Sequence, residues 1–345
     1  MIRRAGIFGR LDVRSLVLCR EVSKTWQEHV DSQRIFWIRK ILKYANSQNK
    51  FHEEWKMISD KTPIERLKRF SRFVWLEPQR ETSPLYAAGA SGVIELFNRI
   101  KEKTGLNEVS KNNLGLTPFH IAAFNNRLNL CKVIIEKIRD KNPGCNQGGT
   151  PLHGAASMGH LKVCEIIIEK LQEKNPGCKK GVTPLHQAAS KGHLQVCKFI
   201  MGKLCAKNPG CKKGVTPLHM AAYNGHLAVC QLILEKVADV NPRSNKGSTP
   251  LHEAATGGHL KIYQLIYEKI AATGLRLRSL KPVKKVDEMN PGNNKGSTPL
   301  HVAAKYGQLD VCKFLCLNLE EKSPKDEGGA TPLHIAAKYG QFEIC

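Results

Sequence analysis

From residue 81 to residue 345, apolar and polar positions follow a pattern that predicts pairs of short helices. The first segment of each pair opens on Thr-Pro, where Thr suits a helix N-cap and Pro suits the first helical position. The second segment places apolar residues three or four positions apart, as in Leu161, Cys164, Ile167, Ile168 and Leu171. A glycine or asparagine stands nine residues after the Thr, where it is typical of a helix end.

The helix pair is an internal repeat. Units start near residues 83, 117, 150, 183, 216, 249, 298 and 331, and most starts lie 33 residues apart. An insertion, residues 271–286, lengthens one interval to 49 residues. One helix pair cannot bury its apolar face alone, so the copies are expected to stack. The sequence therefore predicts an all-α solenoid of eight units.

The recurring TPLHxAAxxGHL at this period resembles the ankyrin repeat, and the resemblance covers residues 81–345. It implies helix–turn–helix–loop units that bind protein partners through loop tips and the exposed side of the first helix. The sequence departs from the family after the second helix, where a glycine is usual. That place is taken by Ile138, Leu171, Leu204, Val237 and Ile270, so the second helix is expected to run on for another turn.

Residues 1–42 predict a small helical region before the repeats. Their motif residues resemble the F-box, which docks on the Skp adaptor subunit of Skp–cullin–F-box ubiquitin ligases; they are Leu11, Leu16, Cys19, Val22, Trp26 and Trp37. The alternative is a plain helical cap for the open end of the stack. Residues 43–80 are predicted to be a helical connector.

Both ends of the chain are shorter than the families lead us to expect. F-box members begin with a Leu-Pro and a helix ahead of the position of Ile7, so we expect the first F-box helix to be incomplete. Cys345 falls early in a second helix, so the last repeat is expected to be truncated.

The stretch CKKGVTPLHQAASKGHLQVC, from Cys178 to Cys197, has the residue types that zinc selects. The sister repeats argue against a metal, because the Cys197 position holds Phe97 and Tyr263 in other units. Free Cys can share an apolar slot with those side chains. We therefore interpret Cys178 as a turn residue, His186 as part of a capping turn, and Cys197 as a core residue, and we expect no metal.

Composition narrows the functional class. The chain has 54 Lys plus Arg against 30 Asp plus Glu, a formal charge of +24, so an acidic partner is expected. It lacks an apolar run long enough for a membrane span and a secretory signal, and its 12 cysteines suit a reducing compartment. We expect a cytoplasmic or nuclear protein. No phosphate-cradling glycine motif or unique catalytic constellation is found, which predicts no enzyme, no cofactor and no small-molecule substrate.

Carried over by position, the ankyrin resemblance predicts a partner-binding face with lysines interleaved with tyrosines. Its loop-tip residues are Lys179, Lys180, Lys212, Lys213, Lys246 and Lys295, and its helix residues are Lys191, Tyr223, Lys305 and Tyr306, with Lys338 and Tyr339 in the last unit. An acidic or phosphorylated protein segment is the expected ligand; an ordinary solvated basic face is the alternative. The basic insertion is predicted to be a mobile loop, with a nuclear-import signal or an anionic contact as the functional alternative.

Together these features predict a protein-interaction protein. The favoured hypothesis is the substrate-recognition subunit of a Skp–cullin–F-box type ubiquitin ligase, with the repeats binding the substrate. An ankyrin scaffold or regulator without a ligase role is the first alternative. A basic nucleic-acid-associated protein is the second, although no recognition helix or RNA-binding signature is found.

Overall fold

The computed structural model describes residues 84–92, 94–104, 110–277 and 289–345, and every regular element in these ranges is a helix. The all-α class and the solenoid of helix pairs are thus confirmed. The predicted F-box region and connector lie outside the described residues. The chain divides into two compact units, Met1–Asn107 and Glu108–Cys345.

The first compact part, Met1–Asn107, contributes one described helix pair. Its helices are α7 (Pro84–Ser91) and α8 (Ile94–Thr104), which are neighbours. Leu85 and Phe97 are fully buried. Phe97 occupies the slot that Cys197 holds in its own unit, and Cys197 is likewise 0% exposed. The prediction that Cys197 is a core residue is confirmed.

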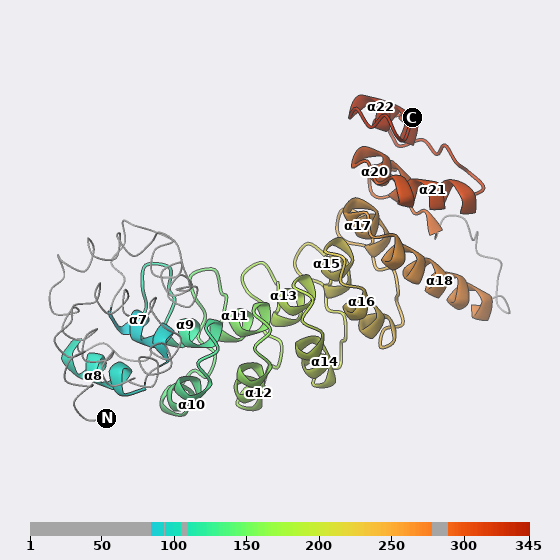
Figure 1. The fold of residues 1–345 in the computed structure, drawn as a ribbon. Coiled ribbons are helices and arrows are strands. Elements are labelled where there is room, and N and C mark those ends of the chain that lie inside the picture. Colours follow the sequence, from blue (N-terminus) through green and yellow to red (C-terminus); the bar gives the residue numbers. More distant parts are fainter. Residues whose placement is uncertain (1–83, 93, 105–109, 278–288) are drawn as a thin grey trace, which may run out of the picture. The chain divides into compact units, whose positions relative to one another are not determined.

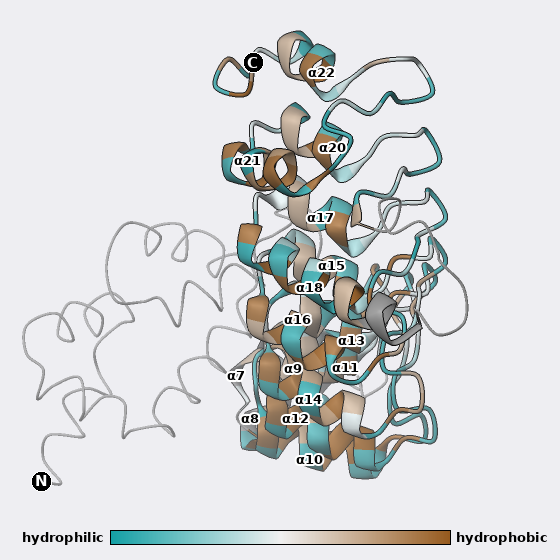
Figure 2. Ribbon diagram, turned by 90° about the vertical axis from the view of Figure 1, so that its right-hand side faces the viewer, coloured by the Kyte–Doolittle hydropathy of each residue, from teal (hydrophilic) through white to brown (hydrophobic). Residues whose placement is uncertain are grey.

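The second compact part, Glu108–Cys345, consists of stacked helix pairs (Figure 1). The first helices pack on one another along the stack; they are α9 (Pro118–Phe124), α11 (Pro151–Ser157), α13 (Pro184–Ser190), α15 (Pro217–Tyr223), α17 (Pro250–Gly257), α20 (Pro299–Lys305) and α22 (Pro332–Lys338). The second helices form another row; they are α10 (Leu128–Lys137), α12 (Leu161–Glu169), α14 (Leu194–Gly202), α16 (Leu227–Leu234), α18 (Leu260–Leu277) and α21 (Leu309–Asn318). Figure 2 shows largely hydrophilic loops projecting from one side of this stack.

In the six units that start from Thr117 to Thr298, a buried histidine joins each unit to the next. His186 Nε2 lies 2.9 Å from the Val215 carbonyl of the following unit, and because a carbonyl only accepts, Nε2 carries the hydrogen. Nδ1 then accepts, from the Thr183 N–H at 3.2 Å and from its hydroxyl at 2.8 Å. The same three contacts recur at His120, His153, His219, His252 and His301.

Burial lowers the pKa of His186 to about 4, and the same desolvation lowers the pKa values of His120 and His252 to about 4. The pKa values of His153 and His219 are also lowered by burial. Geometry acts in the same direction, because a proton added to Nδ1 would face the N–H of the capping Thr. These histidines are therefore neutral in the folded chain.

The Thr before each first helix is the N-cap, as we expected. The Thr183 hydroxyl accepts from the His186 N–H of α13 at 3.5 Å, while the Thr183 N–H donates to the ring of the same histidine. Asn175, from the preceding Asn-Pro-Gly turn, adds a second cap that we did not predict, because it accepts from the Leu185 N–H at 3.0 Å. Equivalent asparagines cap α11, α15, α17 and α20; they are Asn142, Asn208, Asn241 and Asn290. The turn thus supplies part of the cap.

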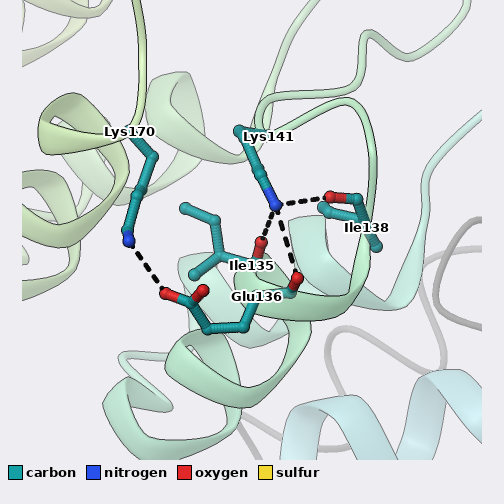
Figure 3. Close-up of polar contacts among 5 residues, drawn as sticks. All are labelled: Ile135, Glu136, Ile138, Lys141 and Lys170. Carbon is teal, nitrogen blue, oxygen red and sulfur yellow. Dashed lines mark hydrogen bonds and ion pairs between the residues drawn. The ribbon is translucent and has the colours of Figure 1, made fainter.

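The expected extra turn of the second helix is wrong in four units. The helices α10, α12, α14 and α16 end before Ile138, Leu171, Leu204 and Val237. In the first of these, Lys141 Nζ donates to the carbonyls of Ile135 and Ile138, each at 2.7 Å (Figure 3). Lys174 and Lys207 make the equivalent contacts. In these three units an ammonium therefore satisfies the carbonyls that another helical turn would have used; no equivalent contact is seen in the described residues after α16.

The unit with the insertion behaves differently. Here α18 continues through Ile270 and includes residues 271–277, so this part of the insertion is helix and not the loop we expected. Residues 278–288 lie outside the described part of the chain. Among the described residues, no helix is both long and apolar enough to span a membrane.

The buried histidines predict a stability that falls in acid. In the unfolded chain each titrates near pH 6.5, so on acidification the unfolded state takes up protons first. Stability from His186 is complete above about pH 6.5 and is lost as the pH falls toward 4, by roughly 3 kcal/mol once this side chain is fully titrated in both states. The His186→Asn variant should start less stable at pH 7 and then lose less on acidification. Urea unfolding followed by circular dichroism at several pH values measures how the free energy of unfolding of each protein changes with pH. The same change in the wild type and in His186→Asn would contradict a neutral, buried His186.

Candidate functional site

The loop tips form one continuous row, which we call the tip row. Each tip is a tight turn, closed in one unit by a bond of 2.7 Å from the Gly181 N–H to the Cys178 carbonyl. Each tip also bonds to the one before it: the Lys212 N–H donates to the Lys180 carbonyl at 3.1 Å, and the Lys179 N–H donates to the Gln147 carbonyl at 3.0 Å. An equivalent bond joins each of the remaining pairs of consecutive tips between Leu114 and Glu327. Figure 1 shows the loops rising on the side of the first helices, away from the second helices.

Every predicted tip lysine is exposed on this row; the residues are Lys179, Lys180, Lys212, Lys213, Lys246 and Lys295. The backbone bonds bring lysines of consecutive tips next to one another, as at Lys180 and Lys212. Among the described residues, no carboxylate forms an ion pair with a tip lysine; the ion pairs Lys162–Glu165 and Lys170–Glu136 lie on second helices or at their ends. The positive charge of the tip row is therefore not neutralised within the described part of the chain.

The charge changes along the tip row although the backbone does not. The tip at Asn146 and Gln147 is neutral, the next two tips each carry two lysines, and the two after those each carry one. The last tip carries Glu327, whose N–H donates to the Lys295 carbonyl. A constant backbone with varied side chains is typical of a recognition surface.

A second surface, the first-helix face, comprises the residues four, seven and eight positions after each Thr. Lys191 is exposed on it, and Tyr223 and Tyr306 are each 50% exposed. Lys305 is half-buried, with Nζ 5.1 Å from the ring centres of both Tyr306 and Tyr339. This cation–π contact fixes the Lys305 ammonium between two rings. The structure thus gathers the predicted helix residues on the first helices, and their role in binding stays a prediction.

Our sequence analysis missed Glu253, four residues after Thr249 on α17. Its side chain is half-buried, and burial raises the pKa of its carboxyl. Among the described residues its carboxylate has neither a hydrogen bond nor an ion pair, although its backbone N–H donates to the Thr249 carbonyl. The signal was available in the sequence: this position is otherwise uncharged from unit to unit, with Ile121, Gly154, Gln187, Met220, Val302 and Ile335.

The residues of the zinc-like stretch are each accounted for by the fold. Both ring nitrogens of His186 are engaged, as described above. Burial raises the pKa of the Cys197 thiol to about 12, which opposes the thiolate that a metal needs. His193 Nε2 donates to the Ser157 carbonyl of the preceding unit at 2.9 Å, a link between units that we did not predict. Within the described residues, no group of three His, Cys, Asp or Glu is placed to hold a metal ion.

The His193 link explains which residues stand at the same position in the other units. His160, His226 and His259 make the same bond to the preceding unit, and Gln308 and Gln341 replace it with a side-chain amide. Both residue types offer an N–H donor at the required distance from the backbone. The position therefore selects a donor, and its function is structural.

Comparison with protein-family models gives two results. The model for ankyrin repeats (three copies) matches overlapping stretches, at residues 85–176, 137–209, 167–244, 185–277 and 271–345. The model for the F-box domain matches residues 6–38. A search of curated proteins gives no match.

The close approach of neighbouring tips makes a prediction about glycine. A Cβ on Gly181, where φ is +73°, would lie 2.8 Å from the Lys212 backbone nitrogen. Gly329 has the same conformation, with φ +75°, and a Cβ there would meet nothing within 4 Å. Both Gly→Ala variants carry the left-handed strain, so the extra loss in Gly181→Ala, on the order of 1 kcal/mol, reports the tip contact. Urea unfolding of both variants measures it; equal losses would contradict the tight tip row.

Proposed function

Because the chain belongs to the ankyrin-repeat family and carries an F-box domain, we propose that it is the substrate-recognition subunit of a Skp–cullin–F-box type ubiquitin ligase. The two modules together support a protein-interaction role, and both families are typically non-catalytic. In this proposal the chain catalyses nothing itself. It holds a substrate beside the ubiquitin-transfer machinery, which raises the local concentration of the substrate there.

The observation that carries this proposal is the tip row in a chain that also has an F-box domain. Four of its lysines stand on two consecutive tips at a fixed spacing, and no acidic residue of the described chain pairs with them; they are Lys179, Lys180, Lys212 and Lys213. An acidic or phosphorylated protein segment has the complementary charge. We propose this class of segment as the substrate element that the repeats bind.

For the adaptor we propose the F-box residues that carry the family resemblance. Leu11, Leu16, Cys19, Val22, Trp26 and Trp37 all fall inside the matched stretch at residues 6–38. Their apolar side chains would contact the Skp-type adaptor. An ankyrin scaffold without this contact is the nearest alternative, and it would bind the same acidic segments.

The nucleic-acid alternative has less support. The basic tips share their row with Glu327, and the first-helix face carries the half-buried Glu253. Both carboxylates would repel a continuous line of phosphates. We also propose a cytoplasmic or nuclear location, because the cysteines of the described residues are all free and free thiols persist in a reducing compartment.

Reversing four tip charges should abolish the binding of acidic segments. In the variant with Lys179, Lys180, Lys212 and Lys213 all changed to Glu, we expect a fluorescent glutamate-rich peptide to lose at least about tenfold in affinity, and wild-type binding to weaken with salt. The matched control reverses Lys132, Lys198, Lys261 and Lys313, which are exposed on second helices and change the net charge equally. Fluorescence anisotropy measures both. Equal affinity of the two quadruple variants would exclude the tip row as the binding surface.

The adaptor contact has a separate test. The full chain should retain a purified Skp-type adaptor in a pull-down, and the double variant Leu16→Ala, Trp26→Ala should lose it because two apolar anchors are removed. The same variant should still bind the glutamate-rich peptide. If the adaptor binds neither the wild-type chain nor the double variant, the result would favour the scaffold alternative.

A further inference from the structure

Glu253 is the one charged side chain at its position along the first-helix face of the described chain. Its helix α17 packs between α15 and α20, where the equivalent residues are Met220 and Val302. The carboxylate is half-buried between these apolar positions and has no partner among the described residues. Removing a carboxylate from water without pairing it is unfavourable, so a positive group that paired with Glu253 on this face would be stabilised.

The surroundings of Glu253 are suited to a Lys or Arg side chain. On the flanking helices, Tyr223 and Tyr306 are each 50% exposed. Tyrosine rings accept the aliphatic stem and the charged end of a basic side chain. The same chemistry already occurs on this face, where Lys305 Nζ stands 5.1 Å from the ring centres of Tyr306 and Tyr339.

The helix that carries Glu253 leaves the carboxylate uncovered. Its positions seven and eight after Thr249 are Thr256 and Gly257, a smaller pair than any other between Thr117 and the C-terminus. The Thr256 hydroxyl donates to the His252 carbonyl at 2.8 Å, so it is engaged with the backbone of its own helix. A Cβ on Gly257 would lie 2.5 Å from the Tyr223 carbonyl oxygen, so a larger residue is excluded there.

We infer that the segment bound by the repeats is bipartite: an acidic block lies on the tips at residues 179–180 and 212–213, and a Lys or Arg side chain pairs with Glu253 between Tyr223 and Tyr306. This inference rests on the proposed function and adds a required positive charge to an otherwise acidic ligand. A uniform polyanion satisfies the tip row but leaves Glu253 unpaired and adds repulsion. The first-helix face would thereby distinguish a protein segment of mixed charge from a nucleic acid or a simple acidic tract.

The test is a cycle of two peptides and two proteins. Both labelled peptides contain the same block of glutamates and a Gly-Ser spacer, prepared in several spacer lengths; one ends in Arg-Leu and the other in Gln-Leu. At the spacer length that gives the tightest binding, the wild-type chain should bind the Arg peptide about fivefold or more tightly than the Gln peptide. The Glu253→Gln variant should lose this preference, and it should bind the Gln peptide more tightly than the wild type does, because the repulsion between Glu253 and the acidic peptide is removed. The control Glu268→Gln removes an exposed carboxylate from the second helix α18 and should keep the preference.

The outcomes separate this inference from the proposal on which it rests. Equal affinity of the wild type for both peptides, or an unchanged preference in Glu253→Gln, overturns the bipartite ligand and leaves the acidic tip contact standing. Failure of both peptides to bind overturns the proposed function and the inference with it. A single-stranded oligonucleotide that binds more tightly than either peptide would instead support the nucleic-acid alternative.

Discussion

The structure depends on one requirement, that each repeat satisfy its buried polar groups through its neighbour. His186 illustrates it, since one ring nitrogen holds the cap of its own helix and the other holds a carbonyl of the next unit. His193 adds a second link in the opposite direction, to the unit before. Apolar burial drives the stacking, but it is non-directional and would tolerate sliding. The histidine bonds fix the register between units because a displaced unit would leave buried donors unpaired.

A fixed register has a direct consequence for the surface. Because the tips repeat with the same backbone bonds, their side chains stand at regular intervals whatever their chemistry. The charge of a tip differs between units while the backbone bond stays the same, as at Lys212 and Glu327. In the proposed function, recognition and stability are carried by different positions of the same repeat. This separation is why the partner is best inferred from the residues that vary between units, such as Glu253, and the fold from those that do not.

Most of the fold could be predicted from the sequence, because the repeat works as an internal mutation series. Thr-Pro marked each first helix, and the exchange of Cys197 for Phe97 and Tyr263 identified a core slot. What failed was tertiary: the second helix stops because Lys141 reaches back to its last carbonyls, and periodicity does not report such a contact. The N–H of Leu185 is likewise capped by Asn175, which lies ten residues earlier in the chain. The tip lysines were found by position. The charge of Glu253 was visible in the sequence as an exception at its repeat position, but its partial burial without a partner among the described residues appears only in three dimensions.

The central claim is that one chain connects an acidic protein segment to the ubiquitin-transfer machinery. The most direct measurement is a reconstituted ubiquitylation reaction with the full chain, a Skp-type adaptor and the cullin subunits, using a lysine-bearing reporter with or without a fused glutamate-rich segment. The account predicts that ubiquitin is transferred to the fused reporter when the full chain is present, and that the unfused reporter is spared. Equal modification of the two reporters, or no transfer to either while the adaptor is bound, would contradict it.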